Sequence, residues 1–507
     1  MTHRPLAHCL EQAAHTHAQR LALRGEDQNL SYEQLLAQAH AVAQRLGQLG
    51  VAEDDAVMLK SSNHPLDFVG LLGIWLACAV AVPVHRTSPS GVVEAIQAKA
   101  QCRFQVDLLA ADAASAVLVI DPRATFVEPG DSMDRSLLRG AALVIFTSGS
   151  TGLPKGVVLS HEAFAAKLQQ NQHLLGLGVN DVTLLVLNNT FSFGIWMALL
   201  TLEHGGTVVT RTRFSPQAFL DTLVREGVTR VGIVPTMVRA TFSSMLEHEL
   251  SVAAAQIRTA AHLRDVVIGG EPLGSDLSAK LRAFIAPADL YDIYGLTETS
   301  TCDVVLTPQD YPKHPGTIGQ VARGVRCRVM NDVGTVCPAG VPGELQLQTP
   351  YIMAGYLGDP EMTRAAFAGE WFRTGDLVTQ DAEGFVTVVG RLKQLIVRGG
   401  NKITPLEIER ALCTCSGVAA ALVTGLPDPV LGQRIHAVLV AEAGVAIDAA
   451  VVRAELMEKL EKYKHPDVCY ISTELPTGRT GKIDRSQFQT LLLAGVLAPL
   501  ASWSHYR

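Results

Sequence analysis

A run of hydroxyl and glycine residues that ends near a lysine is the stretch of this sequence best suited to hold an anion. It follows an apolar, β-branched segment, residues 143–146, which is typical of a buried strand. Glycines let backbone N–H groups turn toward a phosphate, hydroxyls add donors, and the lysine adds charge. We therefore predict a polyphosphate-binding loop at the end of this strand. Its members are Thr147, Ser148, Gly149, Ser150, Thr151, Gly152 and Lys155.

Two other interpretations of this loop are open at this point. Ser, Thr and Gly also cluster in polar surface turns, for conformational reasons alone. The other alternative is a P-loop, G-x-x-x-x-G-K-[ST]. Here Lys155 follows Pro154 and precedes Gly156, so the lysine lacks the glycine before it and the hydroxyl after it. The spacing excludes a P-loop, whereas a surface turn is excluded only if further motifs accompany the loop.

A second cluster, within residues 291–299, combines an aromatic ring with carboxylates and a hydroxyl. Tyr294 offers a flat apolar face for a purine, and Asp292 can accept a hydrogen bond from an adenine amino group. Thr297 can donate to a phosphate oxygen, and Glu298 is a hard oxygen ligand for magnesium. A solvated surface acid is the alternative for Glu298, but its neighbours favour the binding role.

Two more charged residues stand in short motifs nearer the C-terminus. Asp376 ends the segment W-F-R-T-G-D, and its carboxylate can accept from both ribose hydroxyls at once, as acids do in dinucleotide folds. Lys482 lies on a Gly-rich segment, P-T-G-R-T-G-K, which can be mobile until substrates bind. Alone, Lys482 would be an unremarkable surface lysine.

Taken in order, these motifs resemble those of the adenylate-forming superfamily, which contains acyl- and aryl-CoA synthetases, peptide-synthetase adenylation domains and beetle luciferases. T-S-G-S-T-G-x-P-K-G resembles its phosphate loop, Y-G-x-T-E its second signature and W-F-R-T-G-D its third. The resemblance spans roughly residues 30 to 490 and is closest to acyl- or aryl-CoA ligases. It implies that the lysine of the terminal motif, Lys482, bridges the substrate carboxylate and the α-phosphate.

The resemblance also implies an ATP site and a set of catalytic residues. Lys482, Thr297, Glu298 and Arg391 would be catalytic, with Glu298 on magnesium and Arg391 reaching ribose or phosphate. Besides the phosphate loop, the ATP-binding residues would be Gly270, Glu271, Pro272, Asp292, Ile293, Tyr294, Asp376 and Arg391.

The segment at residues 188–196 occupies the position that lines the acyl pocket in this family. Amino-acid-activating relatives usually carry an aspartate where Ser192 aligns, and many CoA ligases carry a histidine; both are missing. Because a buried ammonium needs a counter-charge, an α-amino acid substrate is disfavoured. Ser192 and Asn189 could recognise a hydroxyl or an amine, while simple core packing is the alternative for Phe191 and Trp196. The predicted lining is Asn189, Phe191, Ser192, Phe193, Trp196, Met237, Gly269 and Gly295.

Length and composition limit the classes of protein that this chain can be. Its 507 residues exceed the about 250–300 at which one hydrophobic core stops growing, so at least two domains are expected. A net charge of −7 without a dense basic run disfavours nucleic acid as a partner. Nine scattered cysteines without metal-binding spacing favour reduced thiols in a cytoplasmic protein, and the N-terminus lacks an apolar signal core.

Several elements are expected to position these motifs. Helix-like and strand-like segments alternate to about residue 290, which indicates α/β layers. Ser31 and Ser160 are predicted N-caps, the second of a helix through Leu174, and residues 157–159 and 266–268 are predicted strands. The apolar run at residues 68–84 approaches the about 20 residues of a membrane span, but its ending predicts a core helix followed by a buried strand.

The fold that the resemblance implies is a large N-terminal α/β domain followed by a small mobile α+β domain. Residues 1–390 would form the first, with layered sheets, helices and a β-barrel-like subdomain, and would bind ATP and the carboxylate. Residues 391–394 would be a hinge centred on Lys393, and residues 395–507 a lid carrying the catalytic lysine. Gly399 and Gly400 would leave a bare backbone along the thiol path.

The expected activity is ATP- and magnesium-dependent activation of an aryl or medium-chain carboxylic acid to acyl-AMP, then transfer to coenzyme A. The phosphopantetheine arm of an acyl carrier protein is the alternative acceptor. A non-catalytic nucleotide-binding relative is a second alternative, although intact Lys482, Asp376 and Glu298 argue against it. Only Lys393 supports a third alternative, a luciferase-like oxygenase.

Overall fold

The computed structural model describes residues 4–109, 135–147, 154–260, 262–442, 444–477, 483–500 and 503. Six residues predicted from the sequence to bind phosphate or act in catalysis lie outside these described residues. They are Ser148, Gly149, Ser150, Thr151, Gly152 and Lys482.

A six-stranded sheet ends in the hairpin that carries the predicted phosphate loop. Its order is β17-β7-β6-β4-β3-β5, in which β3, β4, β5 and β6 pair in parallel and β7 runs antiparallel to β6. The predicted strands at 143–146 and 157–159 are confirmed as β6 and β7, and Thr147 faces Lys155 across the hairpin. The strands are β3 (Ala56–Ser61), β4 (Val80–His85), β5 (Phe104–Val106), β6 (Ala141–Thr147), β7 (Lys155–Ser160) and β17 (Gly355–Tyr356).

A nine-stranded sheet carries the second signature at the end of one of its strands. Its order is β14-β13-β12-β11-β10-β8-β9-β1-β2, parallel from β12 through β9 to β1. The strands are β1 (Leu21–Arg24), β2 (Asn29–Ser31), β8 (Val182–Leu185), β9 (Thr207–Thr210), β10 (Arg230–Ile233), β11 (Asp265–Gly269), β12 (Asp289–Tyr294), β13 (Val304–Leu306) and β14 (Gln320–Val321).

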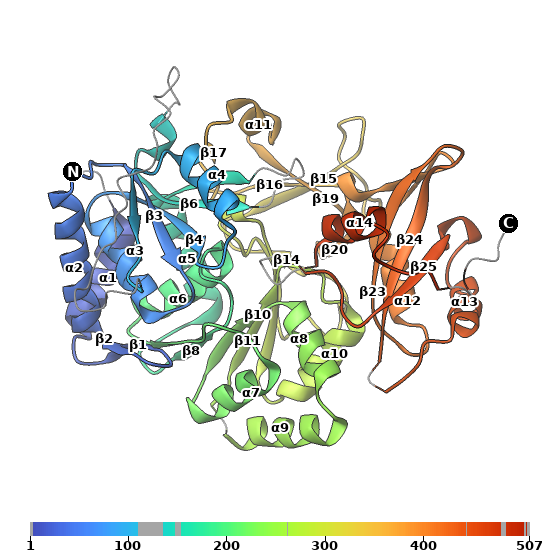
Figure 1. Ribbon diagram of the computed structural model, residues 1–507, viewed down its shortest axis with the longest axis horizontal. Coiled ribbons are helices and arrows are strands. Elements are labelled where there is room, and N and C mark those ends of the chain that lie inside the picture. Colours follow the sequence, from blue (N-terminus) through green and yellow to red (C-terminus); the bar gives the residue numbers. More distant parts are fainter. Residues whose placement is uncertain are drawn as a thin grey trace.

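Helices cover these two sheets, as Figure 1 shows. Ser31 caps α2 with a capping box, Ser160 caps α5, and residues 68–84 form the end of α3 followed by β4, so all three predictions are confirmed. No helix within the described part of the chain is long and apolar enough to cross a bilayer. The helices are α1 (Pro5–Thr16), α2 (Tyr32–Gln48), α3 (Pro65–Leu76), α4 (Ser90–Ala100), α5 (His161–Leu175), α6 (Ser192–Glu203), α7 (Pro216–Arg225), α8 (Pro235–Ser244), α9 (Glu247–Ala260) and α10 (Ser275–Ile285).

A smaller antiparallel sheet, with the order β15-β16-β19-β18, follows in the sequence and leads into the C-terminal part. Its β19 also pairs with β20, which brings the third signature beside the predicted hinge. The elements here are β15 (Arg326–Met330), β16 (Gly343–Gln348), α11 (Pro360–Ala365), β18 (Phe367–Ala368), β19 (Trp371–Gln380) and β20 (Val386–Arg391).

The C-terminal part has its own sheets and hydrophobic core. The antiparallel hairpin β21–β22 precedes a three-stranded sheet, β23-β24-β25, set apart from the large sheets in Figure 1. Buried side chains between Ile396 and Trp503 pack there into a separate core. The elements are β21 (Ile396–Arg398), β22 (Asn401–Ile403), α12 (Pro405–Cys413), β23 (Val418–Asp428), β24 (Gly432–Ala441), α13 (Ala449–Met457), β25 (Val468–Ser472) and α14 (Arg485–Leu493).

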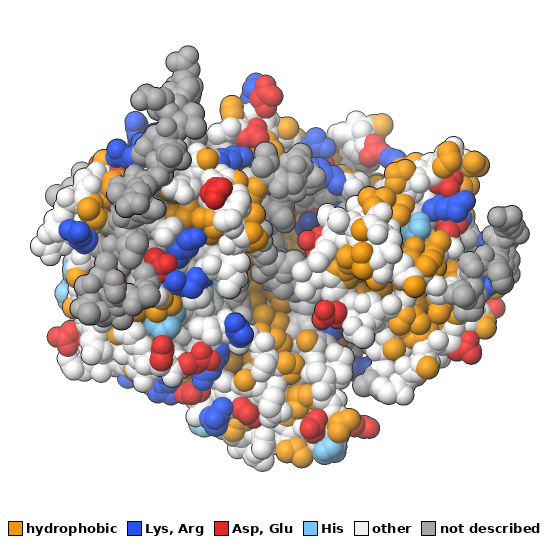
Figure 2. Space-filling model, in the orientation of Figure 1, with side chains coloured by type: hydrophobic (Ala, Val, Ile, Leu, Met, Phe, Trp, Pro, Cys, Tyr) orange, Lys and Arg blue, Asp and Glu red, His pale blue; other side chains and the backbone are white. Residues whose placement is uncertain are grey.

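Basic and acidic side chains are interspersed on the face of the molecule drawn in Figure 2. They do not gather there into one basic surface, as a nucleic-acid-binding face would require. This distribution agrees with the net charge of −7.

Candidate active site

The second signature lies in the loop that joins β12 to β13, and the backbone of this loop is unusual. Ser300, Thr301 and Cys302 have φ values of 60°, 66° and 65°, so three consecutive residues with a side chain adopt the left-handed conformation. The turn brings Cys302 so close to Gly295 that a Cβ at position 295 would lie 2.3 Å from the Cys302 nitrogen. The predicted pocket residue Gly295 is therefore required by this close approach.

A buried lysine holds the loop in this conformation. Lys167, on α5, donates to the backbone oxygen of Cys302 at 3.0 Å and to the Asp303 carboxylate at 3.0 Å. Both charged side chains are fully buried, and the Lys167 ammonium lies 4.4 Å from the centre of the Tyr351 ring. The Thr299 hydroxyl also donates to Asp303. Burial raises the pKa of Asp303, while Lys167 lowers it.

Glu298 and Lys155, predicted from separate motifs, lie beside each other. The Lys155 ammonium is 3.9 Å from a Glu298 oxygen, which also accepts a hydrogen bond of 2.8 Å from the Tyr356 hydroxyl. The ammonium lies 5.0 Å from the Tyr356 ring centre. The backbone oxygen of Glu298 accepts from the Met353 N–H at 2.7 Å. A cation and a carboxylate are thus placed together at the base of the predicted phosphate loop.

This donor set fits magnesium held together with phosphates. Within the described ranges, no group of three or more His, Cys, Asp or Glu side chains could hold a metal ion. Magnesium usually keeps several waters and takes only one or two carboxylates plus substrate phosphates. Glu298, with its side chain 10% exposed, can supply one such carboxylate.

A second cluster joins three strands that are distant in the sequence. Asp376, on β19, is 2% exposed. It accepts from the Tyr294 hydroxyl of β12 at 2.5 Å and from the Arg391 guanidinium of β20 at 2.7 Å. The Arg391 side chain remains 57% exposed, which leaves much of its guanidinium open to a ligand. The structure thus brings together three of the predicted nucleotide-binding residues.

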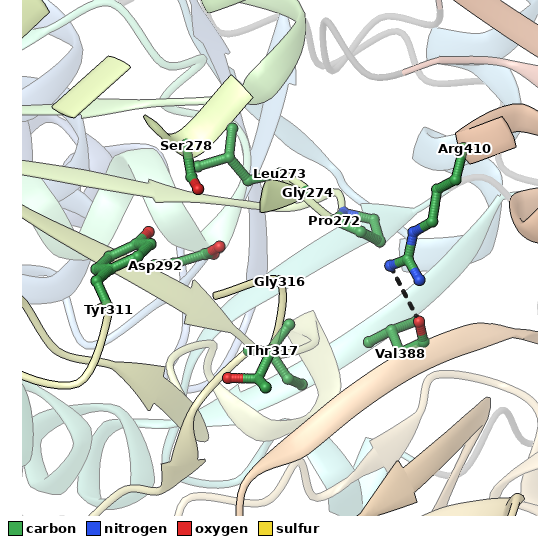
Figure 3. A pocket seen from close by; sticks show the side chains of 11 residues that line it. Pro272, Leu273, Gly274, Ser278, Asp292, Tyr311, Gly316, Thr317, Val388 and Arg410 are labelled. Atoms are coloured by element: carbon green, nitrogen blue, oxygen red, sulfur yellow. Dashed lines mark hydrogen bonds between the residues drawn. The ribbon is translucent and has the colours of Figure 1, made fainter. Parts of the chain in front are cut away.

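A cavity, drawn in Figure 3, lies between the turn after β11 and the end of β20. The predicted nucleotide residues Pro272 and Asp292 line it, together with Arg410 from the C-terminal part. The full lining is Pro272, Leu273, Gly274, Ser278, Asp292, Tyr311, Gly316, Thr317, Ile318, Val388 and Arg410.

Glu271 connects the turn after β11 to the C-terminal part. One of its carboxylate oxygens accepts from Arg239 of α8 at 2.7 Å, and the other accepts from the Ile483 backbone N–H at 2.6 Å. Ile483 pairs with Thr477 across the segment that contains Lys482 in the sequence. The base of the lysine-bearing segment is therefore bonded to the turn after β11, which is predicted to bind ATP.

The predicted acyl-pocket residues lie mostly around the start of α6. Ser192 shares a 2.6 Å hydrogen bond with the Thr301 hydroxyl of the left-handed turn. The side chain of Asn189 bonds to Ser61 at 2.8 Å and to Asp67 at 3.0 Å, inside the protein. Trp196 is fully buried and stacks against Phe193, whereas Phe191, Phe193 and Met237 are only partly buried. Gly269 ends β11, where a Cβ would meet Ile293.

The predicted hinge and thiol-path residues follow Arg391 closely in the sequence. Lys393 is exposed on a short 3₁₀ turn after β20. Gly399 and Gly400 form the tip of the β21–β22 hairpin with φ values of 55° and 82°. In the described part of the chain the contacts of this hairpin include an ion pair of 2.9 Å between Lys402 and Asp332. The hinge and thiol-path roles remain predictions.

Four residues in or around these clusters were not identified from the sequence: Lys167, Arg239, Tyr311 and Tyr356. None stands in a recognisable motif, and each lies at these clusters through tertiary contacts alone. The G-Y dipeptide at residues 355–356 is a weak turn signal at most.

Two family models match the chain. The model described as AMP-binding enzyme matches residues 10–357, and the model of the AMP-binding enzyme C-terminal domain matches residues 407–482. The first covers more than half of the chain and contains the phosphate loop and the second signature.

Relatives with curated functions and solved structures agree with this match. The chain is 31% identical to a feruloyl-CoA synthase of Amycolatopsis sp over 476 residues, which is 91% of this chain and 94% of the relative. It is 36% identical to a sulfoacetate–CoA ligase of Cupriavidus necator over 352 residues, 68% of this chain and 66% of the relative. The structure of o-succinylbenzoate CoA synthetase from Bacillus subtilis with its acyl-adenylate intermediate has a TM-score of 0.80 and 25% identity, covering 95% of this chain and 97% of that one.

Proposed function

The chain belongs to the family of AMP-binding enzymes, and from that premise we propose that it is an AMP-forming acid–thiol ligase. It activates a carboxylic acid with ATP and transfers the acyl group to the thiol of coenzyme A. The observation that carries this function is the position of the loop after β12. The end of β12 and this loop place Tyr294 against Asp376 at 2.5 Å and Glu298 beside Lys155 at 3.9 Å, so one segment contacts the acid that would bind ribose and the cation that would bind phosphate.

The chemistry has two steps. A carboxylate oxygen attacks the α-phosphorus of ATP, the bond to the β-phosphate oxygen breaks, and pyrophosphate leaves. The thiol then attacks the carbonyl of the acyl-adenylate, AMP leaves with the bonding electron pair, and the thiol proton is lost. The first step converts an oxide into a good leaving group with little proton transfer, so catalysis is mainly positioning and charge neutralisation.

Each described cluster has a part in binding the nucleotide. Asp376 would accept from the ribose hydroxyls, and Arg391, which donates to Asp376 at 2.7 Å, would reach ribose or phosphate. The adenine would enter the cavity between Pro272 and Asp292. Lys155 would neutralise the β- and γ-phosphates. When bound, magnesium supplies positive charge against the departing pyrophosphate, and Glu298 would be its protein ligand.

The acid is an aryl or medium-chain acid and not an α-amino acid. The start of α6 offers partly buried aromatic faces, Phe191 and Phe193, for an apolar group. The Ser192–Thr301 hydroxyl pair, joined at 2.6 Å, offers hydrogen bonds but no charge to balance an ammonium. Among the described residues, no carboxylate stands at the start of α6 to replace the missing aspartate.

Product analysis tests this function. The enzyme would be incubated with ATP, magnesium and a panel of aryl, short-chain, medium-chain, dicarboxylic and amino acids, with either coenzyme A or a phosphopantetheinylated carrier protein as acceptor. We expect AMP and an acyl-CoA from an aryl or medium-chain acid, identified by mass spectrometry. Acylated carrier protein without acyl-CoA would identify the alternative acceptor. Formation of AMP without acylation of either acceptor would contradict thiol transfer.

A further inference from the structure

The carboxyl group of Asp292 lines the cavity of Figure 3, and nothing in the described part of the chain balances a charge on it. The residue is 5% exposed. Nearby hydroxyls are bonded elsewhere. Ser278 donates to the backbone oxygen of Ser275 at 2.7 Å. Thr317 donates to the backbone oxygen of His314 at 3.0 Å. Neither hydroxyl is therefore available to Asp292 without breaking an existing hydrogen bond.

The other groups that face Asp292 also provide no partner that would stabilise its charged form. Its neighbours on the adjoining strands, Ile268 and Leu306, are apolar. Arg410, across the cavity, donates to the Val388 backbone oxygen at 3.2 Å, as drawn in Figure 3. No ion pair of Asp292 with any described residue is found within 4.0 Å.

Tyr311 completes the surroundings of this carboxyl group. Its side chain is 2% exposed, and its hydroxyl has no hydrogen-bond partner within the described ranges. Arg282 of α10 lies over the Tyr311 ring, 5.0 Å from its centre. Burial raises the pKa of Asp292 well above its usual value, and burial together with Asp292 raises the pKa of Tyr311. A buried carboxyl group without donors or cations is stable as the neutral acid.

We propose that Asp292 binds the adenine of ATP as a neutral carboxylic acid, a role that rests on the proposed function. Its C=O would accept from the exocyclic amino group while its O–H donates to the adjacent ring nitrogen. A neutral acid presents one acceptor and one donor side by side, whereas a carboxylate presents acceptors only. Adenine presents an amino donor beside a ring-nitrogen acceptor, which is the complementary pattern.

Two properties follow from a neutral Asp292. An asparagine has the same acceptor and donor and needs no proton, so Asp292→Asn should recognise adenine in the same way. Because wild-type binding requires the protonated form, the affinity for ATP should be constant below the pKa of Asp292. Above that pKa it should fall about tenfold for each unit of pH, with uptake of a proton on binding.

Calorimetric titration without a carboxylic acid measures this binding in the absence of turnover. The ligands are ATP, 1-deaza-ATP and 7-deaza-ATP, in which one ring nitrogen is replaced by carbon. The proteins are the wild type, Asp292→Asn and the control Asp289→Asn, whose carboxyl group is exposed on the same strand. Titrations near neutral pH are repeated from about pH 6 to about pH 10.

We expect one of the two deaza analogues to bind about two- to tenfold more weakly than ATP to both the wild type and Asp292→Asn. Any loss of affinity at high pH should occur in the wild type and in Asp289→Asn and be absent from Asp292→Asn. An ionised Asp292 would instead give a wild type that binds both analogues as tightly as ATP, while Asp292→Asn discriminates. That result would overturn the inference, and so would equal affinities of ATP and both analogues for the wild type and for Asp292→Asn. Absence of pyrophosphate exchange with this binding pattern intact would count against the proposed function alone.

Discussion

Tyr356 joins two residues that the sequence motifs single out separately. Its hydroxyl donates to Glu298 at 2.8 Å, and its ring lies 5.0 Å from the Lys155 ammonium. Burial raises the pKa of Tyr356, and the Glu298 carboxylate raises it further, so the hydroxyl remains a donor. Tyr356 therefore orients the carboxylate that would hold magnesium.

Replacing this tyrosine by phenylalanine removes only the hydroxyl. Because a hydrogen bond to a charged group contributes about 1.5–3 kcal/mol, Tyr356→Phe should lower magnesium-dependent adenylation about 10- to 100-fold. The magnesium concentration for half-maximal rate should also rise. Titration of magnesium in a pyrophosphate-exchange assay measures both, with Tyr463→Phe, at an exposed position, as the control. An unchanged magnesium dependence would contradict the orienting role.

At the scale of single residues, the sequence singled out the residues that stand in motifs better than the partners that hold them. Tyr294, Asp376 and Glu298 stand in motifs, and their contacts with ligands remain predictions. Tyr356 and Lys167 serve by long-range contact and leave no local spacing to detect. The side chain of Asn189, predicted to face the substrate, bonds to Ser61 and Asp67.

At the scale of elements, the loop from β12 to β13 depends on the buried pair of Lys167 and Asp303. Three consecutive left-handed residues carry strain that the surrounding contacts must offset. Lys167 supplies a hydrogen bond of 3.0 Å to the Cys302 backbone oxygen as well as the ion pair. The pair thus holds the segment that presents Thr297 and Glu298.

Breaking this pair should destabilise the protein. Lys167→Met leaves Asp303 buried without its cation, at a cost of about 3–5 kcal/mol. The apparent melting temperature should fall, and adenylation should weaken in the fraction that stays folded. Adding Asp303→Asn should recover part of the loss, because the second change removes the unpaired charge. Thermal unfolding of the two single variants and the double variant measures the coupling, and strict additivity would contradict it.

The sequence predicted regular elements well and this loop poorly. The Ser31 cap and the helix–strand change at residues 68–84 follow from local patterns, and both are confirmed. Nothing about Ser, Thr and Cys in succession signals a left-handed turn, since those residue types rarely adopt it. The conformation is imposed by α5 and by the strand that follows.

At the scale of the whole molecule, a few hydrogen bonds hold the C-terminal part beside the cavity of Figure 3. Glu271, held by Arg239 at 2.7 Å, accepts from the Ile483 N–H at 2.6 Å, and Ile483 directly follows Lys482 in the sequence. Arg410 adds a hydrogen bond of 3.2 Å to Val388. We propose that this arrangement is the one used in adenylation, the step for which Lys482 is the predicted catalytic residue.

Loosening Glu271 should therefore affect the two steps unequally. Arg239→Gln removes the cation that orients the carboxylate, so pyrophosphate exchange should fall about threefold to tenfold, the range of one partly exposed hydrogen bond. Thioester formation from supplied acyl-adenylate should stay close to the wild-type rate. Single-turnover assays of each step distinguish them, with Arg258→Gln on the exposed side of α9 as the control. Equal loss in both steps would contradict a contact specific to adenylation.

The division of the chain was predictable, but the orientation of its parts was not. Length predicted at least two domains, the resemblance implied a large α/β part followed by a small C-terminal part, and a separate core exists between Ile396 and Trp503. The boundary at residues 391–394 remains a prediction. The Glu271–Ile483 contact joins residues 212 positions apart, which no sequence pattern encodes.

Carboxylate-dependent exchange of pyrophosphate into ATP tests the central claim most directly, because it reports acyl-adenylate formation without any thiol. A panel of acids would be assayed with the wild type and with Lys482→Ala. We predict exchange with an aryl or medium-chain acid that is lost in Lys482→Ala, while supplied acyl-adenylate still reacts with the thiol. No exchange with any acid, from an enzyme that binds ATP, would contradict an adenylate-forming activity.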